Sequence, residues 1–116
     1  MNIKSVNITF HVSDFQEAVS FYENVLGLHK RTQWPTYAVF DVCGIMLSLE
    51  PGGERGVKKD APDIYLQVDD VDEVYRELKD KGVRFLAEPE DTSWGSRTAK
   101  FADPDGNMFI LVQLKR

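Results

Sequence analysis

The sequence is poor in cysteine and in long apolar runs. Its single cysteine, Cys43, cannot form a disulfide within one chain, which favours a protein from a reducing compartment. Because Cys43 lies in an apolar run, we expect it to be a small core residue. No apolar stretch approaches the roughly 20 residues that a membrane-spanning helix needs. The first ten residues also lack the apolar segment of a signal peptide, so we expect a cytoplasmic protein without a membrane partner.

Positive charge is also scarce. The chain has 14 Lys and Arg residues against 19 Asp and Glu residues, which gives a formal net charge of −5. A nucleic-acid-binding surface needs clustered Lys and Arg, so we expect no nucleic-acid partner. The acidic balance favours neutral or cationic ligands. The hydrophobic fraction of 42% is normal for a globular protein, and 116 residues suffice for one domain but not for two ordinary ones.

Nucleophilic catalysis has no support in the sequence. No Ser-His-Asp or Cys-His arrangement can be proposed, because Cys43 has no partner in sequence or register. His11 has two interpretations that stay open, a capping or turn role and a general base. Arg97 is expected to pair with Glu73 or Glu77, and Lys100 on the opposite face is a candidate contact for an anion.

Local patterns predict two helices and eight strands. Residues 13–27 and 69–82 have helical apolar spacing, with a serine or aspartate at the start and a glycine at the end. Alternation of apolar and polar residues, together with turn residues, predicts the strands. These strands cover residues 3–12, 29–34, 37–42, 45–50, 63–69, 83–87, 97–102 and 108–114.

The two halves of the chain repeat one β-α-β-β-β plan. The helix-opening residues Asp14 and Asp70 lie 56 positions apart, and the turn glycines Gly44 and Gly106 lie 62 positions apart. We therefore expect a single α+β domain over residues 1–116. Its parts are a first module at about 1–50, a linker at about 51–62 and a second module at about 63–116. The linker is rich in glycine, proline and charge, which predicts a flexible connector.

The chain resembles the vicinal-oxygen-chelate superfamily in the segments FHVSDFQEAVSFYENVLGL, LQVDDVDEVYRELKDKGV and WGSRTAKFADPDGN. That superfamily includes glyoxalase I, bleomycin-resistance proteins, fosfomycin-resistance proteins and extradiol dioxygenases. The resemblance covers essentially the whole chain. It implies the glyoxalase/bleomycin-resistance fold, in which two βαβββ modules form curved mixed sheets around a U-shaped groove. It also implies a homodimer with two equivalent grooves.

The resemblance also locates the metal-binding positions of the family. They lie seven residues before each helix-opening aspartate and four residues after each turn glycine. In this chain they hold Asn7, Asp63, Ser48 and Ile110, where the metal enzymes of the family mostly have His, Gln or Glu. Isoleucine offers no donor and a serine hydroxyl is a poor one, so Asp63 is the one credible ligand. Glu50 would raise the number of donors if it turned inward. We expect no metal and no other cofactor.

The groove that we expect has polar walls and two tryptophans. Trp34 and Trp94 lie beside turns, where an indole ring can stack on a planar or cationic ligand. Each ring could instead cap the core or lie in a dimer interface. The expected groove residues are Asn7, Thr9, Trp34, Met46, Ser48, Asp63, Tyr65, Trp94, Met108 and Ile110.

Three functional hypotheses remain open. The first is a metal-free protein of the bleomycin-resistance type, the branch that the chain most resembles, which binds or sequesters a small planar or cationic molecule. The second is an enzyme, either a glyoxalase-like lyase or dioxygenase relative with an atypical metal site, or a metal-independent catalyst with Asp63 as the base. The third is a scaffold whose groove is filled by Met108 and Ile110. In each case a second copy of the chain is the expected protein partner.

Overall fold

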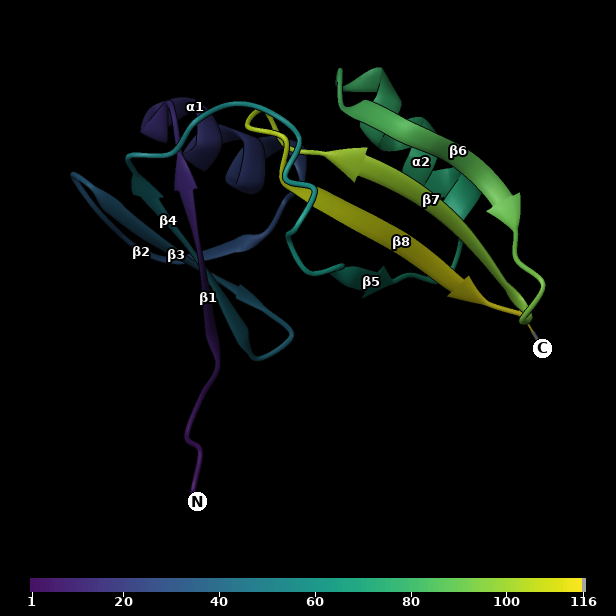
Figure 1. The fold of residues 1–116 in the computed structure, drawn as a ribbon, viewed down its shortest axis with the longest axis horizontal. Coiled ribbons are helices and arrows are strands. Elements are labelled where there is room, and N and C mark those ends of the chain that lie inside the picture. The colour runs from purple at the N-terminus through teal and green to yellow at the C-terminus, as the bar shows by residue number, and fades with distance from the viewer. Residues whose placement is uncertain (116) are drawn as a thin grey trace. The chain divides into compact units, whose positions relative to one another are not determined.

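The computed structural model describes residues 1–115 and contains two copies of the predicted β-α-β-β-β plan (Figure 1). The first copy consists of β1 (Asn7–Val12), α1 (Phe15–Ser20), the π-helical turn η1 (Phe21–Val25), β2 (His29–Trp34), β3 (Tyr37–Val42) and β4 (Ile45–Pro51). The second copy consists of β5 (Tyr65–Gln67), α2 (Val71–Asp80), β6 (Arg84–Asp91), β7 (Ser96–Ala102) and β8 (Met108–Leu114). The prediction of an α+β fold with two tandem modules is confirmed.

Each copy forms a four-stranded mixed sheet with the same strand order. The orders are β1-β4-β3-β2 and β5-β8-β7-β6, in which the first strand runs parallel to the last and the other pairs are antiparallel. Thr9 pairs with Ser48 in the first sheet, and Tyr65 pairs with Ile110 in the second. These pairs are related by the spacings of 56 and 62 read from the sequence, so the internal repeat extends to the strand register.

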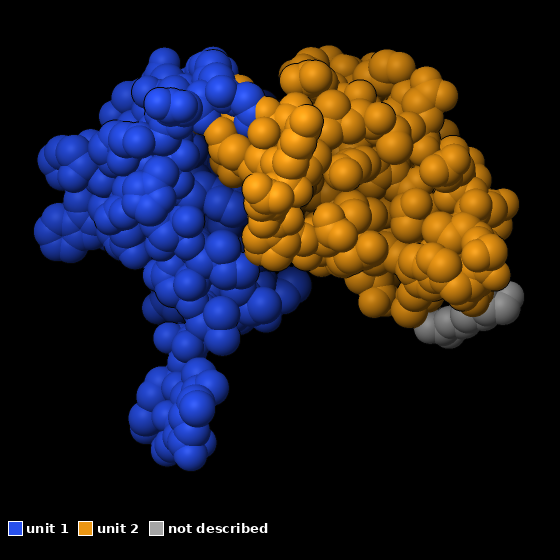
Figure 2. All heavy atoms as spheres, viewed as in Figure 1, with its two compact units in different colours: residues 1–56 blue, residues 57–116 orange. Residues whose placement is uncertain are grey.

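The chain divides into two compact units (Figure 2). Unit 1 covers Met1–Gly56, and unit 2 begins at Val57. In unit 1 the helix α1 packs on β4, and in unit 2 the helix α2 packs on β6, β7 and β8 (Figure 1). Each unit therefore has one sheet face that carries a helix and one that does not. Within residues 1–115, no helix has the length and apolar character needed to cross a membrane.

The helices begin and end where the sequence predicts. The Asp14 and Asp70 carboxylates act as N-caps, accepting hydrogen bonds at 3.1 Å from the backbone N–H groups of Glu17 and Glu73. Each cap satisfies a backbone donor that has no partner within the helix. Gly82 follows α2 with a φ of 87°, which a residue with a Cβ rarely adopts.

Aromatic side chains fill the space between each helix and its sheet. In unit 1, Tyr22 and Phe40 are fully buried, and their ring centroids lie 5.9 Å apart. In unit 2, Phe101 stacks on Phe109 at 5.3 Å and lies 5.8 Å from Phe85. Full burial of one such side chain contributes roughly 1.5–3 kcal/mol to folding. The helix-covered faces are thus occupied by core, and the opposite faces remain for a site.

The prediction that Cys43 is a core residue is wrong. Cys43 and Gly44 form the two-residue turn between β3 and β4, with φ values of 52° and 92°, and the thiol is exposed. A two-residue hairpin turn whose twist matches the strands needs positive φ at both positions. The turn therefore places Cys43 at the surface, although the residues on both sides of it are apolar.

The predicted linker is held against unit 1 at its start. The Gly53 N–H group donates a 3.1 Å hydrogen bond to the Val12 carbonyl, and Arg55 pairs with Glu17 on α1. A Cβ atom at Gly53 would lie 1.9 Å from the His11 carbonyl oxygen, so only glycine fits there. These contacts join the first part of the linker to unit 1.

Candidate functional site

The helix-free face of unit 1 carries a closed hydrogen-bond network. The Ser48 hydroxyl donates to Asn7 Oδ1 at 2.9 Å, and Asn7 Nδ2 donates to the Tyr37 hydroxyl at 3.3 Å. The Tyr37 hydroxyl donates in turn to Ser48 Oγ at 3.1 Å, and the Thr9 hydroxyl donates to Asn7 Oδ1 at 3.2 Å. Strands β1, β3 and β4 supply these four side chains. Because the three-membered ring closes, each of its polar groups finds a partner inside the protein.

The donor set at the family's metal positions does not fit a divalent ion. Asn7 Oδ1 already accepts two hydroxyl protons, and Ser48 is fully buried with its oxygen used as both donor and acceptor. Ile110 has no donor atom, which leaves Asp63, an exposed residue just before β5, as the only carboxylate among the four. Within residues 1–115, no three His, Cys, Asp or Glu side chains are grouped in a way that could hold a metal.

Glu50 does not supply an additional free carboxylate in unit 1. It pairs with His11 Nε2 at 3.2 Å, at the end of β1. The pair also bears on the two interpretations of His11. The cap of α1 is Asp14 rather than His11, and the imidazole contacts a carboxylate on the neighbouring strand.

The helix-free face of unit 2 is built from a row of side chains across all four strands. Ala87 on β6 pairs with Lys100 on β7, Lys100 pairs with Ile110 on β8, and Ile110 pairs with Tyr65 on β5. The residue beside Lys100 on β7, Phe101, is buried in the core. Because side chains alternate along a strand, Lys100 and its row face away from α2.

A pocket of about 230 Å³ lies over this row. Ile110 is one of its lining residues, and Tyr65 and Trp94 are 53% and 60% exposed. Large aromatic side chains with that much exposed surface are available to a ligand. The pocket is lined by Tyr65, Ala87, Glu90, Thr92, Trp94, Thr98, Ala99, Lys100 and Ile110.

The loop that carries Trp94 is anchored at both ends. Thr92 N–H donates to the Ser96 carbonyl at 2.9 Å, the two hydroxyl groups lie 2.8 Å apart, and Lys115 N–H donates to the Gly95 carbonyl at 3.0 Å. These bonds hold the short turn between β6 and β7 in one conformation. The indole is therefore presented by an ordered turn, which lowers the entropy that a ligand must overcome.

Arg97 holds α2 to the sheet next to this turn. Its guanidinium makes two hydrogen bonds to Asp72, at 2.8 and 3.0 Å, and one to Asp91 at 3.1 Å. The hydrogen bonds from Arg97 lower the pKa of Asp72, and those from Lys115 and Arg97 lower the pKa of Asp91. Arg97 does pair with a carboxylate of this helix, as predicted, but the partner is Asp72 and not Glu73 or Glu77.

The predicted groove residues fall into two groups. Asn7, Thr9 and Ser48 join one network in unit 1, where Trp34 pairs with Tyr37 and Met46 pairs with Asn7. Tyr65, Trp94 and Ile110 line one pocket in unit 2. Met108 pairs with Ala102, and neither Met108 nor Asp63 lines that pocket.

The sequence analysis did not identify Tyr37 as a member of the hydrogen-bond network in unit 1. It also did not place Lys100 in the same pocket as Tyr65 and Trp94. Tyr37 opens a predicted strand, and alternation places it with Val39, the strand partner of Ser48. That register was the signal that could have identified Tyr37. Lys100 was assigned to the correct face, but its place beside Ile110 depends on the β7–β8 register, which the sequence does not state.

Comparison with known proteins gives a consistent picture. Residues 4–111 match the family model of the Glyoxalase/Bleomycin resistance protein/Dioxygenase superfamily. The chain is 32% identical to the uncharacterized protein YraH of Bacillus subtilis (strain 168), over 97% of this chain and 99% of that protein. It is 31% identical to the metallothiol transferase FosB of Lysinibacillus sphaericus (strain C3-41), over 94% and 82%. Among solved structures, TnmS3, an antibiotic binding protein from Streptomyces sp. CB03234, has a TM-score of 0.78, 29% identity and 99% coverage of both chains.

Proposed function

Because the chain belongs to the Glyoxalase/Bleomycin resistance protein/Dioxygenase superfamily, we propose that it binds or sequesters a small molecule without the help of a metal ion. The observation that carries the proposal is the pocket of unit 2, where Trp94 and Tyr65 expose aromatic surface and Ile110 adds an apolar side chain to the lining. Ile110 places an apolar side chain at one of the positions that the family resemblance assigns to metal ligands. Such a surface favours a ligand that contributes ring area rather than one that coordinates an ion.

The size and lining of the pocket favour a planar ligand. Ligand pockets for drug-sized molecules usually measure about 300–1,000 Å³. The pocket of unit 2, at about 230 Å³, suits a small ring system or one part of a larger ligand. Stacking of a ring on Trp94 or Tyr65 adds roughly 0.5–1.5 kcal/mol beyond the burial of apolar area.

Two further considerations support a binding protein. TnmS3 is described as an antibiotic binding protein, and it shares 29% identity with this chain over nearly the full length of both. The network of Asn7, Tyr37 and Ser48 occupies in unit 1 the polar groups that a metal would need. We therefore propose a cytoplasmic protein that sequesters an antibiotic-like planar compound.

Binding can be followed with the protein's own fluorescence. The chain has two tryptophans, so a Trp34→Phe variant leaves Trp94 as the single indole reporter. We expect a planar compound from a screen of antibiotics and aromatic metabolites to quench that emission with saturation, and calorimetry to show that Trp94→Ala removes the binding. If calorimetry finds ligands that bind Trp94→Ala as tightly as the parent, the pocket of unit 2 is not the site.

Metal independence has a separate test. Chelator-treated protein is titrated with Mn²⁺, Fe²⁺, Co²⁺, Ni²⁺ and Zn²⁺ while its melting temperature is recorded. A ligand at a hundred times its Kd stabilises the native state by about 2.7 kcal/mol, which gives a clear upward shift. We expect no shift with any ion. An upward shift that Asp63→Ala abolishes would replace this proposal with a metal enzyme.

An enzyme is the second candidate, and the identity of 31% to a metallothiol transferase favours it. Its activity would be that of a transferase, a glyoxalase-like lyase or another relative in the superfamily, with Asp63, the one carboxylate at the four family metal positions, as the candidate base. The test is consumption of a thiol with an electrophilic partner, with and without the five ions. Turnover that Asp63→Ala abolishes would establish catalysis.

We also propose that the protein is a homodimer. Strands β1 and β5 lie at the edges of their sheets, and exposed strand edges are places where modules pair within or between chains. Light scattering should give twice the 13.2 kDa mass of one chain. A mass of 13.2 kDa at micromolar concentration would contradict the dimer.

A further inference from the structure

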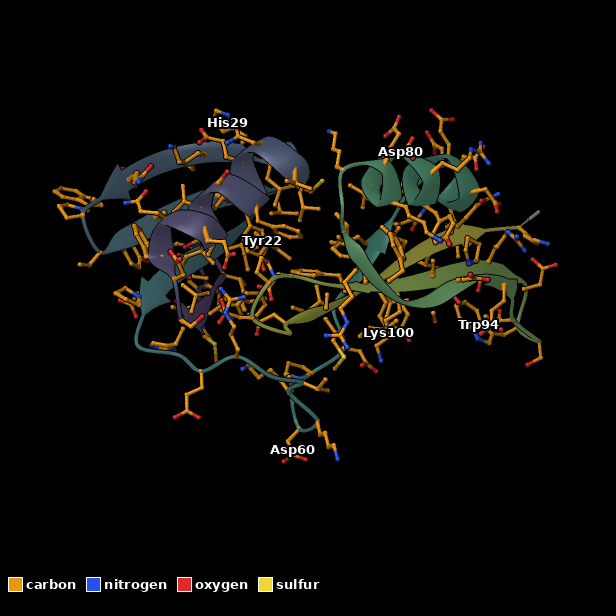
Figure 3. The ribbon with its side chains drawn as sticks, turned by 90° about the horizontal axis from the view of Figure 1, so that it is seen from above. Tyr22, His29, Asp60, Asp80, Trp94 and Lys100 are labelled. Carbon is orange, nitrogen blue, oxygen red and sulfur yellow. The ribbon has the colours of Figure 1, made fainter. Side chains whose placement is uncertain are left out.

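Lys100 brings a positive charge into the pocket of unit 2. It lies in the row between Ala87 and Ile110, and it belongs to the pocket lining together with Trp94. Figure 3 shows the Lys100 and Trp94 side chains on the side of the sheet away from α2. Lys100 is half-buried and lines the pocket, so part of its side chain is packed there.

No carboxylate within residues 57–115 forms an ion pair with this ammonium group at 4.0 Å or less. The acid at the end of β6, Asp91, is taken by Arg97 and Lys115. Glu90 lines the pocket, but it pairs in register with Thr98, two residues along β7 from Lys100. A lysine ammonium group without a paired carboxylate gains a charge-assisted hydrogen bond when an anion binds beside it.

The charge of the pocket differs from the charge of the chain. The formal net charge of −5 favours neutral or cationic ligands at long range. Exposed charges farther apart than about 8 Å are largely screened at physiological salt, whereas a contact inside a pocket is screened much less. The group nearest to a bound ligand therefore decides the sign of charge that is preferred. At the centre of the row that group is Lys100, whereas Glu90 lies toward the turn that carries Trp94.

We infer that the pocket of unit 2 selects a planar aromatic anion, with its ring between Trp94 and Tyr65 and its carboxylate or equivalent acidic group on Lys100. The inference rests on the proposed function, because it assigns a ligand class to the same pocket. Ile110 contributes apolar surface to the same pocket, and the row places Lys100 directly beside it. Ile110 and Lys100 thus place an apolar surface and a cation on neighbouring strands. An aromatic acid could contact the first with its ring and the second with its acidic group.

Three probes of one shape and three charges test the inference. They are 2-naphthoate, 2-naphthamide and 2-naphthamidine, which are an anion, a neutral molecule and a cation at neutral pH. Isothermal titration with the full chain should show naphthoate binding at least tenfold more tightly than either of the others. Lys100→Met should weaken naphthoate at least tenfold and leave naphthamide unchanged, and Lys100→Arg should keep the preference for the anion.

The controls separate this inference from the proposed function. Lys59→Met removes an exposed charge outside the pocket and should leave all three affinities unchanged. Lys100→Glu should reverse the order, so that naphthamidine binds best. If all three probes bind equally and Trp94→Ala abolishes their binding, the pocket binds planar ligands but the charge selection is overturned. If the parent binds none of the probes, both the inference and the planar-ligand pocket fail.

Discussion

Removal of the Ser48 hydroxyl should destabilise unit 1 even though it deletes a single atom. Ser48 is fully buried, and its hydroxyl makes two hydrogen bonds, at 2.9 Å to Asn7 and at 3.1 Å from Tyr37. A hydrogen bond of this kind contributes about 0.5–1.5 kcal/mol net, so Ser48→Ala should cost about 1–3 kcal/mol. The cost lies toward the upper end if the Tyr37 hydroxyl and Asn7 Oδ1 are left without a replacement partner.

The ring closure makes a second, sharper prediction from the same residues. Tyr37→Phe removes the bond that Tyr37 shares with Ser48 and the bond that it accepts from Asn7. In the double variant the shared bond is lost only once. The summed costs of the single variants should therefore exceed the cost of the double variant by about 0.5–1.5 kcal/mol.

Urea denaturation measures each of these free energies. The slope of the transition should stay that of the parent, and only the midpoint should fall. Ser93→Ala is the matched control, because Ser93 is exposed and its loss should change stability by less than about 0.5 kcal/mol. A Ser48→Ala variant as stable as the parent, or strictly additive single variants, would refute the closed network as a source of stability.

Two further predictions concern acid stability and the β3–β4 turn. Hydrogen bonds from Arg97 and Lys115 hold the pKa values of Asp72 and Asp91 below the ordinary 3.8. The two carboxylates therefore stabilise the fold above that pH, and their contribution is lost as the pH falls through their lower pKa values in the folded state. The Arg97→Met variant should therefore have a lower melting temperature than the parent at pH 7, and it should lose less stability between about pH 5 and pH 2. If stability falls equally with pH in both proteins, Arg97 does not stabilise the two carboxylates. Cys43 has a φ of 52°, so Cys43→Asn should raise the free energy of unfolding by about 0.5–1 kcal/mol and Cys43→Val should lower it. Urea denaturation measures both changes, and an unchanged midpoint for both variants would contradict the prediction.

Local signals were sufficient to predict the elements but not every strand boundary. The aspartate caps and glycine stops, such as Asp14 and Gly82, satisfy backbone groups within a few residues and so can be read from the sequence. The first strand was predicted over residues 3–12, whereas β1 is Asn7–Val12. Alternation continues before Asn7, but β4 begins at Ile45 and its first ladder partner in β1 is Asn7. The length of a partner strand is not encoded in the strand it pairs with.

The candidate site was only partly predictable, for a related reason. Strand parity correctly grouped Asn7 with Thr9 and identified Lys100 as lying opposite the core face. The link from Tyr37 to Ser48 depends on the β3–β4 register, which the Cys43 turn determines. The predicted strands 37–42 and 45–50 already left Cys43 and Gly44 as a two-residue turn, so this register could be derived from the sequence. Tyr37 was missed because its strand was not aligned with the strand that carries Ser48, although the predicted turn allowed that alignment.

The two units use equivalent positions in opposite ways. Thr9 and Ser48 in unit 1 correspond by the internal repeat to Tyr65 and Ile110 in unit 2. The first pair satisfies its polar atoms with neighbouring side chains, so that face has few free groups to offer a ligand. The second pair has an aromatic surface and an apolar floor, which gain free energy only when something covers them. Ile110 therefore provides no donor atom for a metal, and in the proposed function it contributes apolar surface to the pocket that Lys100 also lines.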